Sequence, residues 1–138
     1  VELAQEVNER MPVYVAQRAT RLLNTQRKAV NGSVVLLLGV TYKPDIADER
    51  ETPALPLVRR LRALGADVKF VDPYVPTWSV DDKPVTKVDD LATGVAEADL
   101  SIMLAPHKAF DLDLVASRGK LVLDTRGVLT ASDTVERL

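Results

Sequence analysis

Short apolar runs alternate with helical patterns along most of this chain, and this alternation limits the possible folds more than any other feature. The first run, at 33–39, is continuously apolar, which is typical of a strand buried on both faces of a parallel sheet. Between the runs, apolar residues recur at spacings of three and four, as on the buried face of a helix. The sequence therefore predicts an α/β fold, a Rossmann-like doubly wound parallel sheet with helices on both faces. We expect strands at 33–39, 67–71, 100–104 and 120–124, the last of these being the final clear strand, with a short strand possible at 85–88.

A long amphipathic helix is expected before the first strand, from Leu3 to a point between residues 24 and 28. Pro12 interrupts its pattern, which predicts a kink or a restart of the helix. A second helix is expected to begin with Thr52 as its N-cap and Pro53 in the first helical position. Shorter helices are expected at 89–97 and 110–117, and the Pro-rich stretch at 72–83 is expected to form a surface loop.

The composition excludes several classes of function. The 138 residues suit one domain, and 18 basic against 20 acidic residues give a net charge of −2, with no basic surface for nucleic acid. The absence of cysteine excludes disulfides, thiolate metal ligands and a cysteine nucleophile, and it favours a cytoplasmic setting. No apolar run approaches the roughly 20 residues of a membrane helix.

The chain has a single histidine and a single tryptophan, whose roles are considered together here. His107 is the only histidine, so no metal-binding set and no Ser-His-Asp arrangement is expected, and we assign it a loop-structuring or peripheral role. Trp78 could cover the edge of the sheet or face a partner.

The chain begins at Val1 with a helical pattern already under way and without a capping residue, as expected for a piece of a longer helix. We therefore expect two parts, a linking helix at 1–28 and an α/β domain at 29–138. In doubly wound sheets, ligands bind outside the carboxyl ends of the strands. The loops of interest follow Gly39, Val71, Leu104 and Leu123.

The first of these loops replaces the glycine-rich turn of a dinucleotide-binding domain but contains a single glycine, Gly39. Because further glycines are needed for close approach to a pyrophosphate, NAD binding by this chain is not expected. The loop offers side chains instead. Tyr42 could stack on or hydrogen-bond a ligand, and Lys43 could pair with a phosphate or carboxylate or be a solvated lysine.

Charged residues also close this loop and follow the last predicted strand. Arg50 could pair with an acidic neighbour such as Asp48 or bind an anion through its guanidinium. Asp124 is expected to bind nearby loop amides, and Arg126 should project from the same edge of the sheet as the first loop. Two cations at one crevice suggest an anionic ligand.

The stretch 39–54, GVTYKPDIADERETPA, resembles the motif that opens the C-terminal, nucleotide-sugar-binding domain of the UDP-glucose/GDP-mannose dehydrogenase family. That motif has the form G-x-[STA]-[FY]-K followed by D-x-R-x-S. VNERMP at 7–12 is similar to the end of the helix that links the family's central and C-terminal domains, and LDTR at 123–126 is similar to the close of its last strand. The K-P-D-I segment resembles the branch acting on UDP-N-acetylhexosamines, such as UDP-N-acetylmannosamine dehydrogenases.

The resemblance implies a part in oxidising the C6 alcohol of a UDP-sugar to a carboxylate, in two NAD-dependent steps on a catalytic cysteine. That cysteine and the NAD-binding glycines belong to other domains of the family, so the resemblance implies neither catalytic residue, cofactor nor metal in this chain. It implies that Lys43 contacts the UDP-sugar, Tyr42 flanks it and Arg126 lies at the crevice. The implied supporting residues are Asp48, Arg50, Thr52 and Asp124.

Two other hypotheses were weighed beside this one. A stand-alone α/β binding or interaction module without catalysis would have the same fold, whereas a complete small dehydrogenase is contradicted by the missing glycines and cysteine. Family members are usually dimers, and Leu3, Val7 and Met11 would form an exposed stripe in a monomer. We therefore expect a homodimer formed through the N-terminal helix.

Overall fold

The sheet has six parallel strands in the order β5-β2-β1-β6-β7-β8. The computed structural model describes residues 2–41, 44–45 and 52–138, with side chains from Met11 onward. This strand order is that of a doubly wound Rossmann-like sheet, as the alternation of strands and helices predicts. The six strands are β1 (Val34–Leu38), β2 (Asp67–Val71), β5 (Thr86–Lys87), β6 (Leu100–Met103), β7 (Val122–Asp124) and β8 (Val135–Arg137).

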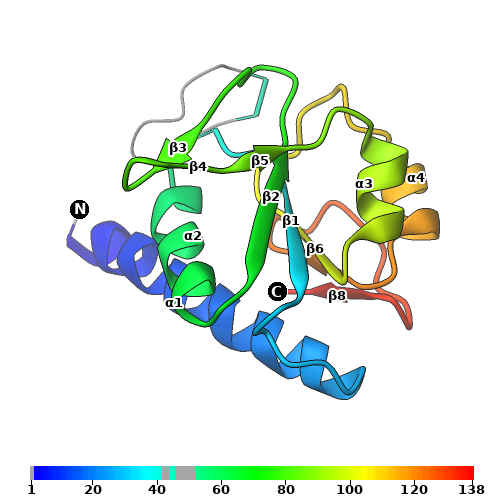
Figure 1. Cartoon of the computed structure of the whole chain (residues 1–138), viewed down its shortest axis with the longest axis horizontal. Helices are drawn as coiled ribbons and strands as arrows, with labels where there is room; N and C mark the ends of the chain where they lie inside the picture. The colour runs from blue at the N-terminus through cyan, green and yellow to red at the C-terminus, as the bar shows by residue number, and fades with distance from the viewer. Residues whose placement is uncertain (1, 42–43, 46–51) are drawn as a thin grey trace.

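Helices cover both faces of the sheet (Figure 1). Val35 and Leu37 of β1 pack in a core shared with the first two helices, whereas Leu36 and Leu38 pack on the other face. Because successive residues of a strand point to opposite faces, this split explains why β1 is apolar without interruption. The helices of the first face are α1 (Glu2–Thr25) and α2 (Ala54–Ala63), and those of the second are α3 (Leu91–Glu97) and α4 (Leu112–Arg118).

α1 runs through Pro12 as one helix, so the predicted restart is wrong. After the proline, Val15, Ala19 and Leu23 are buried against the sheet and α2. One missing backbone hydrogen bond costs less than this packing contributes, so the helix continues. Among the described residues, no helix is both long and apolar enough to cross a membrane.

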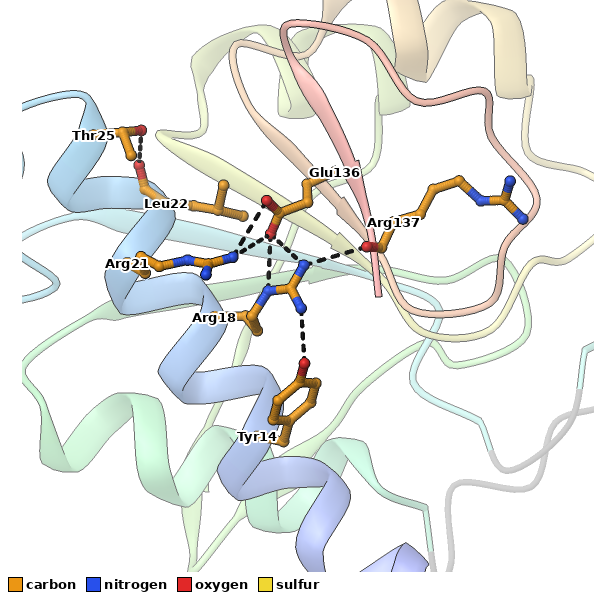
Figure 2. A network of polar contacts seen from close by, with 7 residues as sticks. All are labelled: Tyr14, Arg18, Arg21, Leu22, Thr25, Glu136 and Arg137. Carbon is orange, nitrogen blue, oxygen red and sulfur yellow. Dashed lines mark hydrogen bonds and ion pairs between the residues drawn. The ribbon is translucent and has the colours of Figure 1, made fainter.

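A cluster of charged side chains joins α1 to the edge strand β8 (Figure 2). The Arg18 guanidinium donates to Glu136 Oε2 from Nε at 2.9 Å and from Nη2 at 2.6 Å, and from Nη1 to the Tyr14 hydroxyl at 2.8 Å. Arg21 donates to the same carboxylate at 3.3 Å. The hydrogen bond to Glu136 raises the pKa of Arg18. This cluster fixes the orientation of the helix relative to the last strand.

β8 itself was not expected from the sequence, which placed the last clear strand at 120–124. It has three residues, and of these only Val135 is buried. Val135 pairs with Val122 of β7, and Glu136 is drawn toward α1 by Arg18. A strand this short has no alternating pattern to find, and contacts with distant parts of the chain hold it in place.

The stretch at 72–83 is not the simple surface loop that its prolines predicted. It contains β3 (Ser79–Val80), which forms a hairpin with β4 (Lys83–Pro84). Trp78 is 7% exposed and meets Phe70 edge to face at 5.7 Å between ring centroids, so it covers the core beneath α2. The Arg59 side chain of α2 donates from Nε to both carboxylate oxygens of Asp81 and from Nη2 to Oδ1, at 2.8–3.0 Å. The hairpin is therefore part of the packed domain.

We expect Asp82→Gly to stabilise the protein by about 0.5–1 kcal/mol. Asp81 and Asp82 form the two-residue turn of the hairpin and both have positive φ, 54° and 62°. Glycine adopts this conformation without the steric penalty of a Cβ atom. Thermal unfolding measures the effect, with Asp82→Ala as the control that removes the carboxylate but keeps a Cβ atom. An Asp82→Gly protein no more stable than the wild type contradicts the argument.

Asp99 joins the segment after α1 to the entry of β6. Its Oδ2 accepts the Val34 N–H at 2.8 Å, and its Oδ1 lies 2.6 Å from Lys28 Nζ. The Lys28 hydrogen bond, followed by that of Val34, holds the pKa of Asp99 below its usual value of 3.8. A carboxylate with a lowered folded pKa contributes stability above its unfolded pKa and loses it as the pH falls through the folded one.

We therefore expect Asp99→Asn to cost about 0.5–1 kcal/mol at neutral pH, since the pair is partly exposed and screened. The difference from wild type should shrink as the pH falls below 3.8. Urea unfolding of both proteins across this range measures it. The same substitution in a Lys28→Met background should cost less at neutral pH, and a gap that does not change with pH would contradict the assignment.

Candidate functional site

The carboxyl ends of β1 and β6 form the centre of the candidate site. These neighbouring strands lie where the strand order reverses, the place at which doubly wound sheets bind ligands. Gly39 leaves β1 with φ +81°, and a Cβ atom at this position would lie 2.3 Å from the Ala105 carbonyl oxygen beyond β6. Glycine is therefore required where the two chain segments approach each other.

Asp124 organises the loop after β7, as the sequence predicted. It is fully buried, and its Oδ1 accepts the N–H groups of Arg126 and Gly127, both at 2.9 Å. Its Oδ2 accepts the Leu129 N–H at 2.6 Å. An ionised carboxylate suits this position because every partner is a donor. The loop that carries Arg126 is thus fixed by a charge at the end of the strand.

Arg126 is exposed at this edge of the sheet. Its Nη1 donates to the Leu104 carbonyl oxygen at 3.1 Å, which bridges the loops after β7 and β6. In the part of the chain that the structure describes, no carboxylate pairs with it. The remaining guanidinium N–H groups can therefore reach an anion from outside.

Thr52 lies one residue further from its helix than expected. α2 begins at Ala54, and Pro53 takes the capping position with helical dihedral angles. The Thr52 hydroxyl accepts the Ala54 N–H at 3.2 Å, so the side chain still binds a free amide at the start of the helix. Pro53 has no N–H to donate, and its ring already sets the helical φ, so the Thr52 hydroxyl accepts the next free amide, that of Ala54.

The other residues expected at the site, Tyr42, Lys43, Asp48 and Arg50, lie outside the described residues. The predicted convergence of Lys43 and Arg126 on one crevice therefore stays a prediction. The flanking residues Thr41 and Asp45 are described, and both contact His107 in the loop after β6.

A buried aspartate and the single histidine were missed as site residues by the sequence analysis. Asp72, which follows β2, accepts from the Val40 N–H at 2.8 Å and the Tyr74 N–H at 2.8 Å. Its Oδ2 also lies 2.9 Å from His107 Nε2, and neither side chain is exposed. The other ring nitrogen, Nδ1, lies 2.7 Å from the Asp45 amide nitrogen. These contacts join the loops after β1, β2 and β6, and they confirm a loop-structuring role for His107.

The same contacts argue against NAD in this chain. In a dinucleotide-binding domain the acidic residue near the end of β2 accepts from the ribose hydroxyls, and glycines let the pyrophosphate approach the first loop. Here the Asp72 carboxylate is fully buried and already accepts from the protein, and the first loop has one glycine. The residues present do not fit NAD.

Hollows lined by described residues lie both beside this edge of the sheet and away from it. A pocket of about 190 Å³ borders Asp72, lined among others by Pro73, Lys87 and Phe110. A larger groove of about 510 Å³ lies between α1 and α2, away from the carboxyl edge. Within the described residues, no group of three or more potential metal ligands occurs.

The fold and the carboxyl edge of the sheet together define a class of protein. This class is a doubly wound α/β domain with an exposed arginine beside the point where the strand order reverses. The sequence model of the UDP-glucose/GDP-mannose dehydrogenase family, UDP binding domain, matches residues 36–131 of this chain. Since this match covers more than half of the sequence, the chain belongs to that family.

Known relatives agree with this assignment. A UDP-N-acetyl-D-mannosamine dehydrogenase of Methanocaldococcus jannaschii is 30% identical over 94% of this chain and 30% of its own length. The crystal structure of an NDP-N-acetyl-D-galactosaminuronic acid dehydrogenase from Methanosarcina mazei matches with a TM-score of 0.79 and 27% identity, over 99% of this chain and 30% of that one. A UDP-D-ManNAc dehydrogenase structure from Pyrococcus horikoshii, at 23% identity and a TM-score of 0.77, supports the fold alone. The chain spans about 30% of the length of these relatives.

Proposed function

We propose that this chain is the UDP-sugar-binding domain of an NAD-dependent nucleotide-sugar 6-dehydrogenase, which oxidises a C6 alcohol to a carboxylate. The observation that carries the proposal is Arg126, exposed at the carboxyl edge of β7 and held there by Asp124. A guanidinium with free N–H donors suits the oxygens of a diphosphate. The relatives' names support a UDP-N-acetylhexosamine as the sugar.

The proposed division of labour follows from what this chain lacks. It has no cysteine, and its first loop and Asp72 do not fit NAD, so hydride transfer requires residues outside these 138. In the parent enzyme, another domain would hold NAD, which would supply the hydride acceptor. In this chain, Lys43 and Arg126 would hold the diphosphate, with Tyr42 beside it. Asp48, Arg50, Thr52 and Asp124 would support the loops. Residues 1–28 would act as a linking helix and 29–138 as the binding domain, in the cytoplasm.

A titration followed by amide NMR tests the proposal, using UDP, UDP-N-acetylglucosamine, GDP and NAD with the 138-residue chain. UDP ligands should shift the amides around Arg126 and Gly39 at millimolar concentrations, because the other domains that would cover the sugar are absent. Shifts with NAD alone would overturn the domain assignment. No shift with any ligand would favour the second candidate, an α/β interaction module without a nucleotide site.

We also propose that the chain self-associates through α1. The N-terminal end of this helix extends beyond the sheet and α2 in Figure 1. Tyr14 is 46% exposed on α1, and Leu64 at the end of α2 is exposed to the same degree. Light scattering should give the mass of a dimer, and Tyr14→Glu, at the exposed position on α1, should shift it toward the monomer. A wild-type monomer at high concentration contradicts this proposal.

A further inference from the structure

The loop that carries the proposed UDP-binding residues is fastened at Asp45 by residues beyond β6. The Asp45 N–H donates to His107 Nδ1 at 2.7 Å, and Asp45 Oδ1 accepts the Lys108 N–H at 2.7 Å. We name these two hydrogen bonds, together with the contact between His107 and Asp72, the His107 clasp. Asp45 stands two residues after Lys43 in the sequence and adopts a left-handed conformation with φ 63°.

The contacts of the ring determine where its proton lies. A backbone amide can only donate, so Nδ1 must accept with its lone pair and carry no proton. Nε2 then carries the hydrogen and donates to Asp72 Oδ2 at 2.9 Å. The carboxylate of Asp72 is in turn oriented by the amides of Val40 and Tyr74. The Nε2–H tautomer lets Nδ1 accept from Asp45 and Nε2 donate to Asp72, as for a histidine whose second nitrogen is fixed by a carboxylate. The Thr41 hydroxyl oxygen, 3.4 Å from Nε2, can accept the same hydrogen.

His107 is enclosed by other side chains, so its role is to contact neighbouring residues and not a ligand. The ring lies between Tyr74, at 4.8 Å between centroids, and Phe110, at 5.3 Å. Its side chain is completely buried, so it cannot touch a ligand. The charged groups near it are Asp72 from the end of β2, Asp45 from the first loop and Lys108 from its own loop.

We propose that His107 is a positioning residue. In its Nε2–H tautomer it holds the Pro44–Asp45 turn through Nδ1 and thereby orients this turn at the edge of the sheet where we propose that UDP binds. This inference rests on the proposed function for its ligand, but the clasp itself is testable without one.

Two substitutions separate the two halves of the ring. In His107→Asn, the amide oxygen takes the place of Nδ1 and can still accept the Asp45 N–H. In His107→Gln, the amide nitrogen takes the place of Nε2 and can still donate to Asp72, but nothing accepts from Asp45. Both variants lose the ring packing on Tyr74 and Phe110, so a purely structural role predicts similar losses in both.

The test combines measurements without ligand and with UDP on the 138-residue chain. We expect nitrogen shifts of His107 that report a single Nε2–H tautomer, and an Asp45 amide that exchanges slowly in wild type and His107→Asn but fast in His107→Gln. Where the wild type binds UDP, His107→Gln should weaken binding about tenfold, as expected for one lost hydrogen bond, and His107→Asn should restore most of it. Equal Asp45 exchange in both variants, equal UDP affinity in both, or an Nδ1–H tautomer would overturn the proposal. A wild type that binds no UDP contradicts the proposed function, while tautomer and exchange still decide the clasp.

Discussion

Asp124→Asn is expected to destabilise the domain by about 3 kcal/mol, the loss of a charge-assisted hydrogen bond together with a buried unsatisfied donor. Three backbone amides, those of Arg126, Gly127 and Leu129, donate to this carboxylate. Asparagine has one oxygen, and its NH₂ group would face an N–H group that also donates. Asp124 is fully buried, so water cannot replace the missing acceptor.

Urea unfolding measures this effect, and Asp111→Asn is the matched control. Asp111 caps α4 by accepting the Leu114 N–H at 3.1 Å, but it is exposed and has a single amide to satisfy. An asparagine oxygen can accept that one hydrogen bond, so the control should lose little stability. If both variants unfold at the same urea concentration as wild type, the loop after β7 does not depend on a carboxylate.

Arg126→Ala is expected to weaken UDP binding at least about tenfold, the effect of removing one charge-assisted contact to a phosphate. Its only hydrogen bond from the side chain to a described residue goes to the Leu104 carbonyl oxygen. Since the guanidinium is exposed, stability should change by less than about 0.5 kcal/mol. Arg126→Ala should therefore lower the affinity for UDP with little loss of stability, whereas Asp124→Asn should lower the stability.

Calorimetric titration of UDP into wild type and variant measures the effect. Arg118→Ala is the control for charge alone, because Arg118 is also exposed but lies in the last turn of α4. Arg126→Lys should recover only part of the affinity, since lysine keeps the charge but loses the planar pair of donors. Equal UDP affinity in Arg126→Ala and wild type would remove Arg126 from the site.

The sequence predicted the centre of the sheet and missed parts of its margins. β1 was found because both of its faces are covered by helices, which requires a continuous apolar run. β8 and the β3–β4 hairpin were missed because two or three residues carry no pattern. Arg18 and Arg62 hold them in place through contacts with Glu136 and with carbonyl oxygens of the hairpin. Contacts between distant segments cannot be found from local periodicity.

The candidate site divides in a similar way. The amide contacts of Asp124 at the end of β7 and the place of Arg126 at this edge were predicted from their position at the carboxyl end of a strand, whereas the role of Arg126 in ligand binding stays a prediction. Asp72 was predicted only as the first residue of the loop at 72–83, and its contact with His107 joins residues 35 positions apart in the sequence. The available signal was an aspartate directly after β2 together with the only histidine of the chain after β6. Its meaning depended on the strand order.

The most direct test of the account is the structure of this chain with UDP bound, determined by crystallography or by NMR. We predict that the diphosphate lies at the carboxyl ends of β1, β6 and β7, with its oxygens within hydrogen-bond distance of the Arg126 guanidinium. The uracil and ribose should lie along the same edge of the sheet. UDP bound in the groove between α1 and α2, or with its diphosphate away from Arg126, would contradict the central claim that this edge is the nucleotide site.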